Sequence, residues 1–172
     1  MKTLVVLAHP NIETSRINKG WMTRLESEEH ITIHNIYKEY PDMKIDVKKE
    51  QQLVESHERI VFEFPFYWYN APALLKLWQD EVFAFGFSHG PNGNKLVGKE
   101  FMLAISAGGQ EEAYRAGGMQ RFTISELTKT FENMASFTKM NYKPAFVAYD
   151  AHNLTDEKVR ESAEALANLL TK

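Results

Sequence analysis

Five short runs of apolar, β-branched and aromatic residues alternate along the chain with longer segments whose apolar residues recur every three or four positions. The runs predict strands over residues 3–8, 31–37, 60–64, 101–106 and 145–149. A helical pattern follows each run, and this alternation is typical of a parallel sheet with helices on both faces. The sequence therefore predicts an α/β fold.

Apolar stripes and capping residues mark several of the helices. The stripes consist of Ile17, Trp21 and Leu25; of Leu74, Trp78 and Val82; and of Val159, Ala163, Leu166 and Leu170. Helix starts are predicted at Ser15 and Thr155, and at Thr123, where Glu126 completes a capping box. These helices should pack their stripes against the sheet.

The second strand is more polar than the first, third and fourth, which is expected of a strand at the edge of a sheet. Right-handed crossovers then favour a doubly wound sheet of five parallel strands in the order 2-1-3-4-5. The length of 172 residues suits one domain, so we expect residues 1–172 to fold as a single unit.

Composition narrows the class of protein. The chain is 44% hydrophobic and 25% charged, and no apolar run approaches the roughly 20 residues that cross a bilayer. The N-terminus does not have the pattern of a signal peptide, so we expect a cytoplasmic protein. The net charge of −3 gives no basic surface for nucleic acid. Cysteine is absent and the six histidines are scattered, so we expect no metal site, and redox chemistry requires a bound cofactor.

An aromatic segment between two prolines, residues 65–72, joins the third strand to the next helix. Strand-to-helix loops are usually small and polar, whereas this loop contains Phe66, Tyr67, Trp68 and Tyr69 in succession. The flanking prolines restrict the backbone that carries these side chains. The segment indicates a binding surface for a flat ligand, although aromatics near a strand end often only fill the core.

Loops after the first and fourth strands add complementary chemistry. The first contains His9, Thr14, Ser15, Arg16 and Asn18 where a helix begins, and helix N-termini bind phosphate through free backbone N–H groups. The fourth strand ends in residues 106–109, Ser-Ala-Gly-Gly, where paired glycines allow a close approach of the backbone to a ligand. In a sheet of this order the loops meet at one edge, and together they suit flavin mononucleotide (FMN).

Sequence motifs of other nucleotide-binding proteins and of serine hydrolases are absent or incomplete. There is no G-x-G-x-x-G after the first strand, and the P-loop-like residues 93–99 are followed by Glu100 instead of Ser or Thr. No G-x-S-x-G is present, so a serine hydrolase is not favoured.

Together, Leu-Ala-His-Pro at residues 7–10, Ser15 with Asn18, the aromatic segment and Ala-Gly-Gly at residues 107–109 resemble the flavodoxin-like NAD(P)H:quinone oxidoreductase family over nearly the whole chain. The chain is most similar to short bacterial members, including ancillary flavoproteins of glutathione-gated potassium efflux systems. The resemblance implies a flavodoxin-like domain, bound FMN or FAD, and two-electron reduction of quinones or similar flat acceptors by NADH or NADPH. It also implies a homodimer with its active sites at the subunit interface.

The resemblance assigns roles to individual residues. His9, Ser15, Arg16, Ile17 and Asn18 would hold the flavin phosphate and ribityl chain, and residues 66–69 would lie along the flavin ring. Ser106, Ala107, Gly108 and Gly109 would close over its pyrimidine side. Tyr114 corresponds to a tyrosine that lines the quinone pocket and is the candidate catalytic residue, while Gln120 stands where larger relatives have a histidine.

Two alternatives to a free enzyme remain open at this point. The resemblance implies, as the first, a regulatory flavoprotein that binds a potassium efflux transporter at the inner face of the cell membrane. The second is a flavodoxin-type electron carrier, for which stronger acidity is expected. A homodimer also has support from residues 83–87, Phe-Ala-Phe-Gly-Phe, whose aromatic surface is typical of an interface.

Overall fold

A parallel sheet forms the centre of the protein, which we describe from a computed structural model covering residues 1–171; Lys172, the last residue of the predicted domain, lies outside the described residues. The strands are β1 (Thr3–Leu7), β2 (Ile31–Asn35), β3 (Arg59–Pro65), β4 (Glu100–Ser106), β5 (Asn141–Tyr142) and β6 (Phe146–Ala148). Their order is β2-β1-β3-β4-β5, with β6 also paired to β4, and every pairing is parallel. The predicted doubly wound order is therefore confirmed.

Two predicted strands differ from those in the structure. The fifth, predicted over residues 145–149, corresponds to β6, and an additional short strand, β5, precedes it. β5 pairs with the start of β4 and β6 with its end, and Pro144, which has no backbone N–H to donate, lies between them. The second strand was predicted to reach Tyr37 but ends at Asn35. The Asn35 side chain caps a short helix there by accepting a hydrogen bond from the Lys38 backbone N–H.

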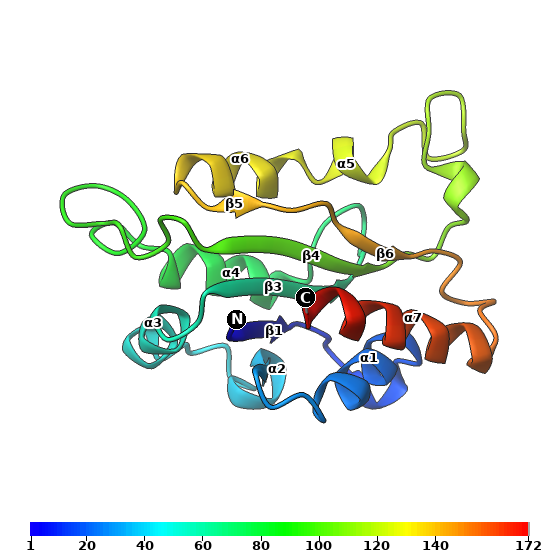
Figure 1. Ribbon diagram of the computed structural model, residues 1–172. Helices are drawn as coiled ribbons and strands as arrows, with labels where there is room; N and C mark the ends of the chain where they lie inside the picture. The colour runs from blue at the N-terminus through cyan, green and yellow to red at the C-terminus, as the bar shows by residue number, and fades with distance from the viewer. Residues whose placement is uncertain (172) are drawn as a thin grey trace.

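Helices cover both faces of the sheet (Figure 1). They are α1 (Ile17–Leu25), α2 (Ile36–Glu39), α3 (Val47–Glu55), α4 (Ala73–Val82), α5 (Ile124–Leu127), α6 (Lys129–Phe137) and α7 (Asp156–Leu170), with short 3₁₀ turns at Ile12–Thr14 and Glu111–Ala113. The capping box of Thr123 with Glu126 and the Thr155 cap are present as predicted. No helix within residues 1–171 is both long and apolar enough to cross a bilayer.

Two apolar clusters, one on each face, hold the layers together. On one face α1 and α7 lie side by side, and the Trp21 indole N–H donates to Ser162 Oγ at 2.8 Å to join them (Figure 1). The other face is covered by α2 to α6, and its cluster includes Trp78 and Phe62. The central strands β1 and β3 are buried between these layers, and β4 is buried except at Glu100.

The dimer prediction from residues 83–87 needs correction. Phe83 and Phe87 are only 7% and 6% exposed and belong to the core cluster, and Phe83 stacks on Phe62 at 6.2 Å between ring centroids. Only Phe85 remains outside, 72% exposed. This loop folds back onto the core, so it does not present the broad aromatic surface that was predicted.

Candidate functional site

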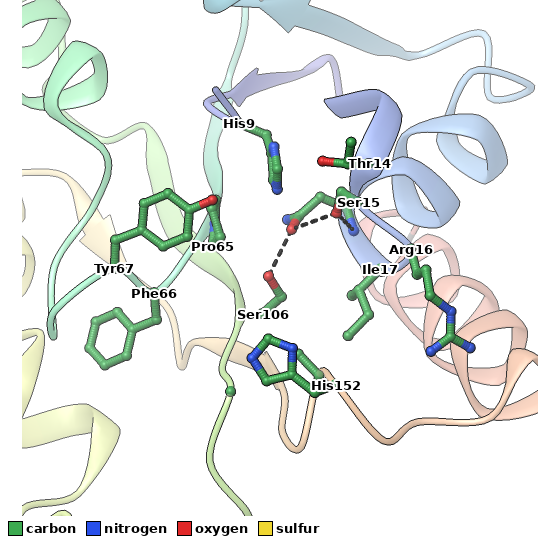
Figure 2. Close-up of a pocket in the computed structure, with 13 residues that line it drawn as sticks. His9, Thr14, Ser15, Arg16, Ile17, Pro65, Phe66, Tyr67, Ser106 and His152 are labelled. Atoms are coloured by element: carbon green, nitrogen blue, oxygen red, sulfur yellow. Dashed lines mark hydrogen bonds between the residues drawn. The ribbon is translucent and has the colours of Figure 1, made fainter. Parts of the chain in front are cut away.

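A cavity of about 400 Å³ opens where β1, β3 and β4 end, at the point where the strand order reverses. Ligands of doubly wound sheets bind at such a crevice. The cavity is lined by His9, Thr14, Ser15, Arg16, Ile17, Asn18, Pro65, Phe66, Tyr67, Ser106, Gly108, Ala151 and His152 (Figure 2). The structure thus brings together the three loops that the sequence singled out.

The N-terminus of α1 forms one wall of the cavity. Ser15 makes the predicted capping contact, since its Oγ accepts the Asn18 backbone N–H at 3.1 Å, although the helix itself begins only at Ile17. The first N–H groups of a helix have no partner within it, and they attract anions together with the positive end of the helix dipole. This wall can therefore hold a phosphate.

His9 supplies a hydrogen-bond donor opposite that helix. Its ring is 8% exposed, and burial lowers the pKa of the imidazole below its usual value, which favours the neutral form at pH 7. Nδ1 accepts the Asn11 backbone N–H at 3.1 Å, so the neutral ring carries its proton on Nε2. Figure 2 shows the His9 ring pointing into the space between Tyr67 and Ser15.

Arg16 lines the cavity but points away from its centre in Figure 2. Its guanidinium donates to Asp156 Oδ1 at 2.6 Å, and both side chains are substantially exposed. The ion pair joins the start of α1 to the start of α7. Asp156 offsets part of the positive charge, and the role of Arg16 in holding a phosphate stays a prediction.

The aromatic loop divides into two parts. Phe66 and Tyr67 line the cavity, whereas Trp68 and Tyr69 occupy a tight turn closed by two backbone hydrogen bonds between Tyr67 and Asn70. Both turn residues have positive φ, 46° and 65°, which is unfavourable for side chains of this size. Trp68 is 91% exposed, and Tyr69 donates its hydroxyl hydrogen bond to Gln120 Oε1 at 2.8 Å. Only part of the predicted aromatic surface therefore faces the cavity.

Close packing explains the paired glycines after β4. Neither takes a positive φ. A Cβ on Gly109 would lie 3.0 Å from Tyr114 Cε2, and one on Gly108 would lie 3.3 Å from His152 Nε2. Ser106 and Gly108 line the cavity, whereas Ala107 is fully buried beside it.

Tyr114, the candidate catalytic residue, lies outside this cavity. It is 9% exposed and lines a neighbouring cavity of about 580 Å³ between the segment containing α5 and α6 and the β6 strand. Its ring packs against Gly109, and burial is the main reason that the pKa of the phenol is raised. The residue therefore touches the cavity loop from behind, and its catalytic role stays a prediction.

Sequence reasoning missed the loop after β6, which adds Ala151 and His152 to the cavity. The loop is joined to the β4 loop by backbone hydrogen bonds from Asp150 to Gly109 and from Ala151 to Ala107, of 2.9 and 3.0 Å. Figure 2 shows the His152 ring beside Ser106 and Ile17. The predicted strand order could have identified this loop, because the last strand also ends at this edge of the sheet.

A buried carboxyl beneath the cavity was missed as well. Glu63, on β3, is fully buried, and its Oε1 accepts from Asn18 Nδ2 at 3.4 Å. Asn18 Oδ1 in turn accepts from Ser106 Oγ at 2.7 Å. The second oxygen, Oε2, has no hydrogen-bond partner among residues 1–171, and burial raises the pKa of Glu63 to about 8.

The family model described as flavodoxin-like fold matches residues 1–170. The chain belongs to this flavodoxin-like family. A Bacillus subtilis relative named as an uncharacterized NAD(P)H oxidoreductase, YrkL, is 54% identical, with 99% of this chain and 98% of the relative covered. The glutathione-regulated potassium-efflux system ancillary protein KefG of Yersinia enterocolitica is 38% identical, covering 98% of this chain and 92% of that protein.

Two solved structures are similar to the chain over nearly its whole length. General stress protein 14 of Treponema denticola, in complex with FMN, superposes with a TM-score of 0.94 at 37% identity, covering 99% of this chain and 98% of that one. An NADPH-quinone reductase from P. pentosaceus gives 0.90 at 34% identity, covering 98% of this chain and 97% of the other. These similarities extend over the whole described fold, including the cavity loops.

Proposed function

We propose that the protein is an NAD(P)H-dependent flavoprotein oxidoreductase that reduces quinones, or similar flat acceptors, by two electrons. The observation that carries this proposal is the cavity at the sheet reversal, where a helix N-terminus, an aromatic wall and exposed backbone converge. Relatives named as an NAD(P)H oxidoreductase and an NADPH-quinone reductase support the activity.

The residues present fit FMN. Ser15 and the first N–H groups of α1 would hold the phosphate, and His9 Nε2–H would donate to an oxygen of the cofactor. Phe66 and Tyr67 would flank the flavin ring, and the backbone at Gly108 would face its pyrimidine edge. The FMN complex of the Treponema protein favours FMN over FAD. Bound flavin would supply the hydride chemistry, while these residues orient it and stabilise charge.

One cavity has to serve both the nicotinamide and the quinone. We infer that they bind in turn, in a ping-pong scheme, because both flat substrates would use the same wall of the cavity, formed by Phe66 and Tyr67. Tyr114 lines the neighbouring cavity, and its ring centroid is 6.5 Å from that of Phe66, so it would act on the acceptor oxygen from the Phe66 side.

We also propose a homodimer, with an interface different from the segment first considered. Trp68, Met119 and Phe122 are 91%, 87% and 51% exposed on the two loops that the Tyr69–Gln120 hydrogen bond joins. Exposed apolar side chains grouped beside a cavity are typical of an interface. A second copy on this surface would complete the open side of the flavin site.

The first experiment is spectroscopic. Purified protein should carry FMN at one per chain, identified by absorbance and by mass analysis of the released cofactor. NADH or NADPH should bleach the flavin band without oxygen, and a quinone should restore it. A protein that stays colourless, and whose melting temperature excess FMN does not change, would refute the proposal.

A second candidate function is regulation of a potassium efflux transporter, favoured by the full-length similarity to KefG. The two functions predict different rates of quinone reduction by the isolated protein. A regulator would bind flavin but show slow quinone reduction, and it would co-purify with the transporter. Rapid turnover with NADH or NADPH by the isolated protein favours the enzyme.

A further inference from the structure

Glu63 is a buried ionisable group that the proposed chemistry does not use. It is completely enclosed on β3, yet within residues 1–171 its only side-chain hydrogen bond reaches Asn18, a residue that lines the cavity. A buried carboxyl oxygen without a partner is costly, so its retention beside a binding site calls for a functional explanation.

The hydrogen bonds around Asn18 define which way two serine hydroxyls point. In the structure, Asn18 Nδ2 donates to Glu63. Asn18 Oδ1 accepts from Ser106 Oγ at 2.7 Å and from Ser15 Oγ at 3.4 Å, and dashed lines in Figure 2 mark these bonds to the two serines. With both protons turned toward Asn18, the serine oxygens offer only lone pairs to the cavity. That arrangement repels an anion such as a phosphate.

A proton on Glu63 reverses the arrangement. The protonated acid becomes a donor, and it satisfies its hydrogen by donating to Asn18 Oδ1 once the amide has turned by half a revolution. Asn18 Nδ2 then donates to the oxygens of Ser15 and Ser106. Both hydroxyl protons are released toward the cavity, where they can bind anionic oxygen.

We propose that Glu63 is a positioning residue that sets, through the Asn18 amide, whether Ser15 and Ser106 accept or donate hydrogen bonds in the cavity, and thereby couples the binding of a phosphate-bearing flavin to the uptake of one proton. The inference rests on the proposed FMN site. Electrostatics act in the same direction, because an ionised Glu63 lies on the same side of the cavity as the phosphate and repels it.

The sign of the pH dependence follows from these states. Protonated Glu63 binds flavin better, so the Kd for FMN should be flat below pH 7 and rise as pH passes the Glu63 pKa of about 8. A group of this pKa that must be protonated for binding gives a Kd about ten-fold higher at pH 9 than at pH 7. At pH 8.5 FMN binding should take up about 0.8 proton per site.

Other charged groups facing this region come from α1, α7 and the adjoining loops. His9 has a lowered pKa and so stays neutral between pH 7 and 9, and Asp156, held by Arg16, has a lowered pKa and stays ionised. The residues that pair with Glu63 on β1 and β4 are Leu7 and Ala104, and neither is charged. His152, on the loop after β6, is the group that needs a control.

The test measures the Kd for FMN by quenching of flavin fluorescence, from pH 7 to pH 9, in wild type, Glu63→Gln and His152→Gln. Glutamine matches the protonated acid in shape and can donate to Asn18 Oδ1. We expect Glu63→Gln to bind FMN within about two-fold of wild type at pH 7 and to lose the ten-fold rise in Kd at pH 9. In His152→Gln the ratio of the Kd at pH 9 to the Kd at pH 7 should equal that of wild type.

Calorimetry in two buffers of different ionisation enthalpy counts the protons taken up by wild type, and this count stands even if Glu63→Gln does not fold. FMN binding with no pH dependence and no proton uptake would overturn the inference but leave the proposed function intact. A His152→Gln variant whose Kd for FMN no longer rises between pH 7 and pH 9 would also overturn the inference. Failure of wild type to bind FMN at every pH would instead overturn the proposed function.

Discussion

Replacing Glu50 tests how the β2 edge of the sheet is held against the helices that cover it. Glu50, on α3, is fully buried and accepts three side-chain hydrogen bonds, from the Trp78 indole at 2.7 Å, the Tyr40 hydroxyl at 2.5 Å and His34 Nε2 at 2.9 Å. These contacts join β2, the end of α2, α3 and α4. We predict that Glu50→Gln lowers the free energy of unfolding, although glutamine has the same shape.

The magnitude follows from the change in each bond. A hydrogen bond to a buried carboxylate is stronger than a neutral one by about 1 kcal/mol, so three of them give a loss of about 3 kcal/mol. Glutamine still accepts from Trp78, and its amide can donate to Tyr40 Oη or to the other tautomer of His34. For a chain of this size, about 3 kcal/mol corresponds to a fall of about 6–12 °C in melting temperature.

The pH dependence gives a second, independent check. Burial acts to raise the pKa of Glu50, but hydrogen bonds from His34, Tyr40 and Trp78 outweigh it, and the net shift is downward. A lowered carboxyl pKa stabilises the fold above the pKa of the unfolded chain, about 4.3, and this stability is lost as pH falls toward the folded value. The difference between wild type and Glu50→Gln should therefore be complete at pH 7 and shrink below about pH 4.

Thermal unfolding followed by circular dichroism, with the exposed Glu81→Gln on α4 as control, measures both effects. The control should remain within about 0.5 kcal/mol of wild type. Equal melting temperatures for wild type and Glu50→Gln at pH 7, or a difference that does not change in acid, would refute this account of the Glu50 hydrogen bonds.

Further predictions concern the flavin site and its surface. Tyr114→Phe should slow the quinone half-reaction about ten-fold and the NAD(P)H half-reaction less, as stopped-flow absorbance would measure; equal quinone rates remove Tyr114 from the mechanism. Gly108→Val should prevent stoichiometric flavin binding, because its side chain would meet His152 and occupy the wall of the cavity; retained flavin would contradict this role of the loop. Gly109→Ala should weaken flavin binding, since its Cβ would lie 3.0 Å from Tyr114 and displace the loop; an unchanged Kd would argue against it. Trp68→Ser should shift light-scattering mass from dimer toward the 19.9 kDa monomer, and a wild type that is already monomeric at micromolar concentration would refute the dimer.

The sequence alone determined the framework of this protein. Apolar residues repeat with the period of a helix around Trp21 and Trp78 and form continuous runs in the central strands, and both patterns are local. The polar second strand and the rule of right-handed crossovers then fixed the strand order. Because parallel strands end at the same edge, that order also placed the loops containing His9, Phe66 and Ser106 around one cavity.

Only the tertiary structure decided which side chains face that cavity. Trp68 points to solvent from a strained turn, Tyr114 lies behind Gly109, and Phe83 and Phe87 pack into the core. Whether each of these side chains is buried or exposed depends on contacts between segments far apart in the chain, and local spacing in the sequence does not predict such contacts. The same holds for Glu63, whose place in a buried strand looks like an ordinary core position. Its environment is set by Asn18, 45 residues away in the chain, and by the burial that raises its pKa.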